Sequence, residues 1–166
     1  MGVTHRDALE RLLAARTSAL LRTAYLLTGD AEAARDLLQS ALERVLPRLG
    51  RIQDPQALEA YVRRTMATTA SNQRKRFWHR EVPSERTPEH AGGEVDSDTR
   101  LTLVRALQQL SPDLRTVLVL RFYEDLSEAQ VADLLGIPAG TVKSRTSRGL
   151  QALRDNGIAL VEEGQA

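Results

Sequence analysis

The sequence predicts an all-α fold of two small helical domains joined by a flexible acidic linker. Leu, Ala and Arg dominate the 166 residues and aromatic residues make up only 4%, a composition that favours helix. Apolar residues also recur at helical spacing in several segments. Residues 81–97, in contrast, hold prolines, glycines and acids and almost no large apolar side chain, which is typical of a linker.

The first domain, residues 1–80, begins with an amphipathic helix expected over residues 4–27. Its leucines follow roughly helical spacing. Thr28-Gly29 ends this helix, because glycine supplies the left-handed conformation common after helix ends. Asp30 is a good N-cap for the next helix.

Two more helices complete the first domain. The second is expected over residues 31–46, where Pro47 stops it. Asp54-Pro55 then repeats the start signal, because proline is tolerated at the first helical position. The third helix runs from there to about Trp78.

The second domain, residues 98–160, opens with a helix over residues 98–110. Ser111-Pro112 caps the next helix. That helix directs Leu114, Val117, Leu118 and Leu120 toward a core. Residues 161–166 form a short tail.

Residues 127–148 predict a helix-turn-helix. Ser127 with Gln130 makes a capping box for a short helix that ends at Leu135. Gly136 gives a left-handed exit and Pro138 prevents continuation, so a last helix follows over residues 139–156. Val131, Leu134, Leu135 and Val142 are expected to pack inward, Ala132 to face the partner helix, and Ile137 to fill the turn.

The second helix of such a unit enters the major groove of DNA. The residues expected near its start or on its outward face are Thr141, Lys143, Ser144, Arg145 and Arg148. The plain alternative is a helical hairpin whose last helix has a solvated basic face.

A second basic segment lies at residues 72–80, NQRKRFWHR. Arg74, Lys75, Arg76 and Arg80 are suited to phosphate contacts, and Phe77 and Trp78 beside them could stack on bases of an opened strand. The alternative is that Phe77 and Trp78 close a helical core while the cations are solvated.

Short polar residues precede this segment inside the third helix: Thr65, Thr68, Thr69, Ser71 and Asn72. Ser and Thr are weak helix formers. The run indicates either tight helix packing or a polar face that binds a ligand, and the sequence leaves both open.

Bulk properties exclude several classes of function. No run approaches the roughly 20 apolar residues of a membrane span, so we expect no membrane insertion and a cytoplasmic location. The chain has no cysteine and three scattered histidines, and it lacks clustered catalytic groups and a Gly-rich phosphate loop. We therefore expect no catalytic residues, no metal site, no cofactor and no enzymatic activity. The net charge is only +1, because the charges of the basic segment and of the acidic linker largely cancel in the sum.

Three stretches together resemble a bacterial RNA polymerase sigma factor of the small extracytoplasmic-function (ECF, group IV) type. They are LTGDAEAARDLLQSALERV at 27–45, the basic run at 72–80, and LQQLSPDLRTVLVLRFYEDLSEAQVADLLGIPAGTVKSRTSRGLQALR at 107–154. The Arg- and Ala-rich composition is similar to that of actinobacterial members of the sigma-E-like type.

This resemblance implies roles for both domains. Residues 1–80 would be region two, which binds core polymerase and opens the minus-ten element, and residues 98–160 would be region four, whose helix-turn-helix reads the minus-thirty-five element. The implied polymerase-binding residues are Asp36, Leu37, Gln39, Ser40 and Glu43. The implied minus-ten residues are Arg63, Arg64, Thr68, Ser71, Asn72, Arg74, Lys75, Arg76, Phe77 and Trp78. The linker would thread toward the active-site cleft and the RNA exit path.

The chain departs from the family pattern at three places. Ser40 stands where an acid usually follows Gln39, and Val45-Leu46 replace an aromatic residue. The loss of the carboxylate at Ser40 is expected to weaken the contact with the polymerase clamp somewhat. Thr68 stands where the family often has Asn near a flipped base, so the base preference there is open.

The sequence therefore predicts a sigma factor that directs promoter recognition, promoter melting and initiation. Its expected partners are core RNA polymerase (β′ clamp helices and β flap), promoter DNA and an anti-sigma factor. Three rival hypotheses are a stand-alone helix-turn-helix regulator, a small helical enzyme and a protein-interaction adaptor. The first rival lacks a basic-aromatic domain, and it should bind duplex DNA tightly without polymerase.

Overall fold

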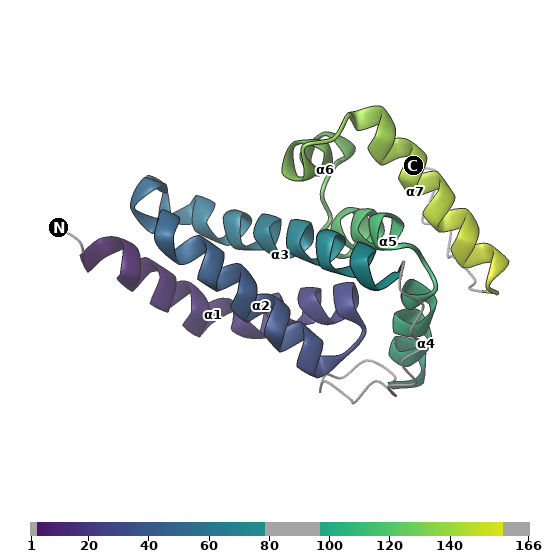
Figure 1. Ribbon diagram of the computed structural model, residues 1–166, viewed down its shortest axis with the longest axis horizontal. Coiled ribbons are helices and arrows are strands. Elements are labelled where there is room, and N and C mark those ends of the chain that lie inside the picture. Colours follow the sequence, from purple (N-terminus) through teal and green to yellow (C-terminus); the bar gives the residue numbers. More distant parts are fainter. Residues whose placement is uncertain (1–2, 79–96, 158–166) are drawn as a thin grey trace. The chain divides into compact units, whose positions relative to one another are not determined.

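The computed structural model describes residues 3–78 and 97–157, and every regular element in these ranges is helical (Figure 1). The all-α prediction is confirmed. The chain divides into two compact units, Met1–Ala91 and Gly92–Ala166. None of the helices in the described ranges has the length and apolar character that a membrane span requires.

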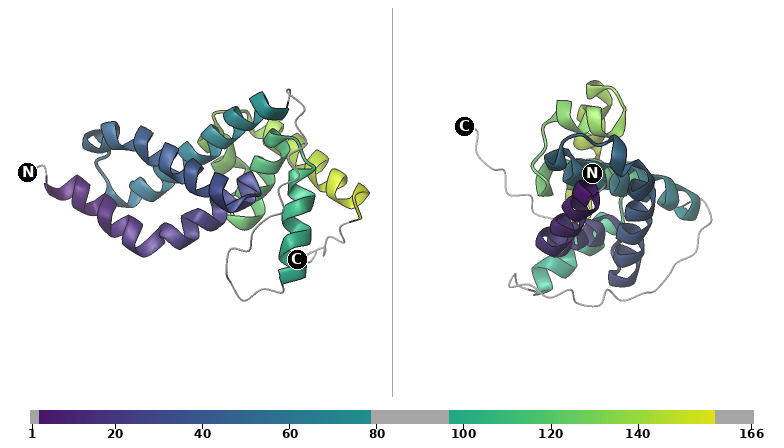
Figure 2. Two further views of the ribbon diagram at one scale, coloured as in Figure 1. Left: turned by 60° about the horizontal axis from the view of Figure 1, so that its bottom comes forward. Right: turned by 90° about the vertical axis from the view of Figure 1, so that its left-hand side faces the viewer.

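The first unit is a three-helix bundle of α1 (Val3–Thr28), α2 (Ala31–Val45) and α3 (Pro55–Trp78). Each helix packs against the other two, and Figures 1 and 2 show the three helices side by side. The largest fully buried side chains among its described residues are Leu20, Leu27, Val45, Val62, Met66 and Thr69. Burying one such aliphatic side chain stabilises the fold by about 1.5–3 kcal/mol relative to leaving it exposed.

Capping groups fix the helix starts of this unit as predicted. Gly29 has φ 78°, a left-handed conformation that ends α1 before α2 begins. The Asp30 carboxylate accepts a hydrogen bond from Ala33 N–H at 2.9 Å. Asp54 Oδ1 accepts one from Gln56 N–H at 2.9 Å and so caps α3.

The end of α2 differs from the prediction. The helix ends at Val45, and the chain continues as a 3₁₀ segment, η1 (Leu46–Arg51). Pro47 does not stop the helical course because it lies in the first turn of η1, where its missing N–H is not needed. Arg48 Nη1 donates to Tyr61 Oη on α3 at 2.9 Å, and this hydrogen bond raises the pKa of the Arg48 guanidinium.

In residues 97–157, the second unit has four α-helices and one π-helical segment. They are α4 (Ser97–Gln108), α5 (Pro112–Leu118), the π-helical segment η2 (Val119–Tyr123), α6 (Glu128–Leu135) and α7 (Ala139–Asp155). The side chains at the centre of its core are Val104, Leu110, Val117, Leu120, Val131 and Val142.

Two details of α5 correct the prediction. Ser111 stands at the N-cap position, but its side chain makes no capping hydrogen bond, so the helix start rests on Pro112. Leu114 is only half-buried, whereas Val117 and Leu118 are in the core as predicted. The π-helical segment after α5 was not predicted.

A buried arginine joins α4 to α5. Arg115 is 2% exposed. Its Nε donates to Leu107 O at 2.9 Å, and its Nη2 donates to Leu110 O at 2.9 Å and to Gln108 O at 3.4 Å. The guanidinium therefore donates to two carbonyls in the last turn of α4 and to one in the turn that follows, where helix carbonyls lack intrahelical partners.

Candidate nucleic-acid interface

The helix-turn-helix of α6 and α7 forms as predicted. Ser127 Oγ accepts from Gln130 N–H at 3.1 Å, and Gln130 Oε1 accepts from Ser127 N–H at 2.8 Å, which completes the capping box. Gly136 has φ 67° and ends α6. Ile137 N–H then donates to Ala132 O at 3.1 Å and closes the turn. The signals in the sequence thus act at both ends of the short helix.

One stripe of α7 is buried. Its members are Val142, Thr146, Gly149 and Leu153, and the Thr146 hydroxyl donates to Val142 O at 2.7 Å. Gly149 brings α7 against α5, since a Cβ there would lie 2.9–3.2 Å from side-chain atoms of Leu118. This close contact sets how α7 sits on α5.

The opposite face of α7 is open. Lys143, Ser144 and Arg148 are exposed, and Thr141 is half-exposed in the first turn. Ser147 shares this face and was not predicted, although its spacing from Lys143 and Ser144 places it there. The face offers two cations and several short polar groups, a combination that suits a DNA groove and its phosphates.

Arg145 does not belong to the open face. Its side chain is only 23% exposed, and its Nη2 lies 3.7 Å from Asp113 Oδ2 on α5. The sequence grouped Arg145 with the outward residues, whereas the structure sets it at the edge of the α5–α7 packing.

The hydroxyl-rich part of α3 uses most of its hydroxyl groups internally. Thr65 donates to Tyr61 O at 2.8 Å, and Thr68 donates to Arg64 O at 3.0 Å and to Thr65 O at 3.2 Å. Both hydroxyl oxygens still have lone pairs that can accept a hydrogen bond.

Thr69 lies inside the bundle. It is fully buried, and its Oγ1 accepts a hydrogen bond from Arg44 Nη1 of α2 at 2.9 Å. Of the two roles that the sequence allowed for this run, tight helix packing and ligand binding, Thr69 therefore has the packing role. Ser71 is half-buried and Asn72 is exposed.

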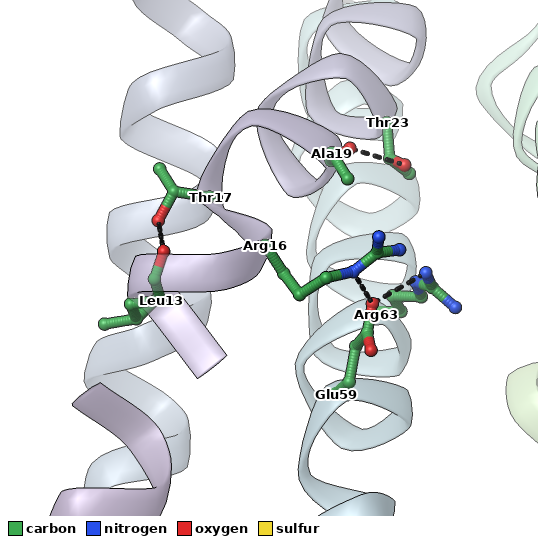
Figure 3. Close-up of polar contacts among 7 residues, drawn as sticks. All are labelled: Leu13, Arg16, Thr17, Ala19, Thr23, Glu59 and Arg63. Atoms are coloured by element: carbon green, nitrogen blue, oxygen red, sulfur yellow. Dashed lines mark hydrogen bonds and ion pairs between the residues drawn. The ribbon is translucent and has the colours of Figure 1, made fainter. Parts of the chain in front are cut away.

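Arg63 and Arg64, two of the α3 arginines that were predicted to contact DNA, have different surroundings. Arg63 Nη2 pairs with Glu59 Oε1 at 2.8 Å, and Arg16 Nε of α1 pairs with the same oxygen at 2.8 Å (Figure 3). The Arg63 side chain is 24% exposed, whereas Arg64 is exposed. Arg63 therefore belongs to a link between α1 and α3, and Arg64 is open to a ligand.

Several predicted features lie partly or wholly outside the described residues. The backbone of α3 is helical to Trp78, so the basic-aromatic run begins on a helix. The side chains of Arg74, Lys75, Arg76, Phe77 and Trp78 lie outside the described residues, as do residues 79–96 and the tail.

The predicted polymerase-binding residues of α2 separate into two groups. Asp36, Gln39 and Glu43 are exposed, Ser40 is half-exposed, and Gln39 Nε2 donates to Glu43 Oε1 at 3.4 Å. Leu37, in contrast, is 2% exposed and belongs to the core. Leu37 therefore supports the helix from within and is not part of its open surface.

An aromatic pair on η2 was missed by the sequence reasoning. Phe122 and Tyr123 are 56% and 46% exposed, and the Arg121 guanidinium lies 5.6 Å from the centroid of the Phe122 ring. Adjacent aromatic residues directly before a turn were the available signal.

Residues 100–153 match the protein family described as Sigma-70, region 4. The chain is 38% identical over 156 residues to the RNA polymerase sigma-E factor of Streptomyces coelicolor, and the match covers 90% of this chain and 86% of the relative. It is 35% identical over 164 residues to the ECF RNA polymerase sigma factor SigL of Mycobacterium tuberculosis, covering 89% and 88%.

The fold is also similar to a solved structure. That structure is the sigma factor RpoE in complex with the anti-sigma factor NepR from Bartonella quintana. The TM-score is 0.72 at 25% sequence identity, and the match covers 89% of this chain and 94% of that one.

Proposed function

The chain belongs to the ECF group of RNA polymerase sigma factors, which direct transcription initiation, and we propose that its two units divide promoter recognition between them. Residues 1–80 act as region two, which binds core polymerase and opens the minus-ten element. Residues 98–160 act as region four, which reads the minus-thirty-five element. Residues 81–97 act as the linker between them.

The open face of α7 carries the proposal for region four. Lys143, Ser144 and Arg148 are exposed on a helix whose other face is fully packed, and Thr141 lies in its first turn. In a helix-turn-helix this helix lies in the major groove, and its N-terminal residues reach the base edges. Cations on that face also contact phosphates, which adds affinity that falls as salt rises.

For region two, the support comes from the C-terminal half of α3. Arg64 and Asn72 are exposed and Thr68 keeps acceptor capacity, so this face can hold a base that leaves the stack. Arg74, Lys75 and Arg76 would contact the backbone of the opened strand, and Phe77 and Trp78 would stack on bases. Arg63 and Ser71, which are half-buried, would hold this face in place without contacting the base.

Polymerase binding is assigned to the open surface of α2. Asp36, Gln39, Ser40 and Glu43 present a polar, acidic face that suits the β′ clamp helices. The second unit would bind the β flap. We also propose an anti-sigma factor as a regulator, because the similar RpoE structure is a complex with one. The proposed role is non-enzymatic and cytoplasmic, where polymerase and DNA are.

Run-off transcription tests this proposal. Core RNA polymerase of a Streptomyces species is combined with the full chain and a pool of genomic promoter fragments, with core polymerase alone as the control. New transcripts that require the chain, and that share two upstream sequence elements, are the expected result. Tight footprints on duplex DNA without polymerase, and no new transcript, would instead indicate a stand-alone regulator.

A further inference from the structure

Asp113 stands on α5, outside the helix-turn-helix, yet it pairs with a cation of α7. We propose that Asp113 is a positioning residue for Arg145, and that it holds Arg145 for contact with the DNA backbone beside the groove rather than with a base edge. The proposal rests on the proposed function of α7 as the recognition helix.

The place of Arg145 on α7 supports a backbone contact. At about 100° per residue, Arg145 lies roughly 60° around the helix from Val142 and roughly 40° from Gly149. Both of these residues are buried. Lys143, Ser144 and Arg148 lie about 100° or more from Val142. Residues at the centre of the open face meet the base edges, so a residue at its flank meets the strand that borders the groove.

The geometry of the ion pair leaves Arg145 able to bind a phosphate. The separation of 3.7 Å between Nη2 and Oδ2 is too long for a hydrogen bond, so the attraction is ionic. Within the described residues the Arg145 side chain donates no hydrogen bond, so its five N–H donors remain available. A phosphate oxygen can accept two of them side by side.

The carboxylate also restricts a long side chain before DNA arrives. An arginine loses rotamer freedom when a ligand immobilises it, and this loss weakens binding. Both side chains are largely shielded, with 23% and 28% exposed, so the guanidinium is already confined near α5. Removing the carboxylate should release Arg145 and weaken the contact, even though a negative charge near DNA is removed as well.

The test is a double-mutant cycle in holoenzyme. Wild type, Asp113→Asn, Arg145→Ala and the double variant are each assembled with core polymerase. Their affinity for a promoter fragment from the run-off assay is measured over a range of salt, with the minus-thirty-five element intact or scrambled. Glu128→Gln is the matched control, since Glu128 is also an acid in the first turn of a helix. Asp113→Glu, which keeps the carboxylate, tests for rescue.

We expect Arg145→Ala to weaken binding similarly on both fragments and to lower the slope of log affinity against log salt by about one. Asp113→Asn should weaken binding about two- to fivefold when Arg145 is present and not at all when it is absent. Asp113→Glu should restore much of the loss, and Glu128→Gln should cause none.

An equal effect of Asp113→Asn with and without Arg145 would overturn the positioning role. A loss caused by Arg145→Ala on the intact element and not on the scrambled one would overturn the backbone contact. Wild-type holoenzyme that binds intact and scrambled elements equally would overturn the proposed function of region four, and this proposal with it.

Discussion

The two helices that we propose to contact DNA, α3 and α7, use their polar side chains in different ways. On α7, four residues account for the packing, and exposed cations and serines remain on the other face. On α3, Thr69 is itself part of the core, Arg63 is ion-paired, and the hydroxyls of Thr65 and Thr68 donate to their own helix. A polar residue is therefore a good candidate for ligand contact only where other residues of the same helix already form its packed face.

The largest effect should come from the buried polar group of the second unit. Arg115→Ala removes the guanidinium donor from three carbonyls of the α4–α5 corner, of which Leu107 O keeps the Leu110 N–H. We expect it to lower the free energy of unfolding by about 3 kcal/mol. Arg105→Ala, at an exposed arginine in the last turn of α4, should change stability by less than about 0.5 kcal/mol. Urea unfolding followed by circular dichroism measures both. Equal losses would mean that burial of Arg115 does not matter.

A smaller effect is expected at the contact of α7 with α5. Gly149→Ala forces its Cβ against Leu118, and we expect a loss of about 1–3 kcal/mol. Gly140→Ala meets nothing within 4 Å and has no positive φ, so it should raise stability by up to about 1 kcal/mol. Thermal unfolding midpoints of the two variants should move in opposite directions. A stable Gly149→Ala variant would contradict the close approach of α7 to α5.

The smallest effect on stability is expected from removing the hydroxyl groups of Thr69 and Thr68 on α3. Thr69→Val removes the acceptor of Arg44 inside the bundle and should cost about 1 kcal/mol of stability. Thr68→Val removes only the hydrogen bonds to Arg64 O and Thr65 O of its own helix and should cost less than about 0.5 kcal/mol. On the proposed function, it should also lower promoter opening. Stability is measured by urea unfolding and opening by run-off transcription. The reverse order of stabilities would contradict the buried role of Thr69.

Helix boundaries were predictable because their signals are local. A cap residue, a left-handed glycine and a capping box each act within a few residues of the chain, as Asp30, Gly136 and Ser127 do here. The open face of α7 was predictable in part: Lys143 and Arg148 are exposed as expected, whereas Arg145 is not.

Features that depend on packing between helices could not be predicted. Arg115 and Arg145 read as ordinary cations in the sequence, and only the fold brings carbonyls to the first and Asp113 to the second. Leu37 was named as a polymerase contact although it is 2% exposed, because a helix that docks on a partner also needs a face in its own core. The π-helical η2 was not predicted, because such a segment has no sequence signature of its own.

The most direct test of the account pairs one variant from each unit with changes in each promoter element. Run-off transcription is measured for wild type, Asn72→Ala and Arg148→Ala on promoters with an intact, a minus-ten-altered or a minus-thirty-five-altered sequence. We predict that Arg148→Ala makes transcription less sensitive to the minus-thirty-five change and leaves its sensitivity to the minus-ten change intact. Asn72→Ala should have the opposite pattern. Variants that lose sensitivity to both elements equally, or to the opposite element, would contradict the division of promoter recognition between the two units.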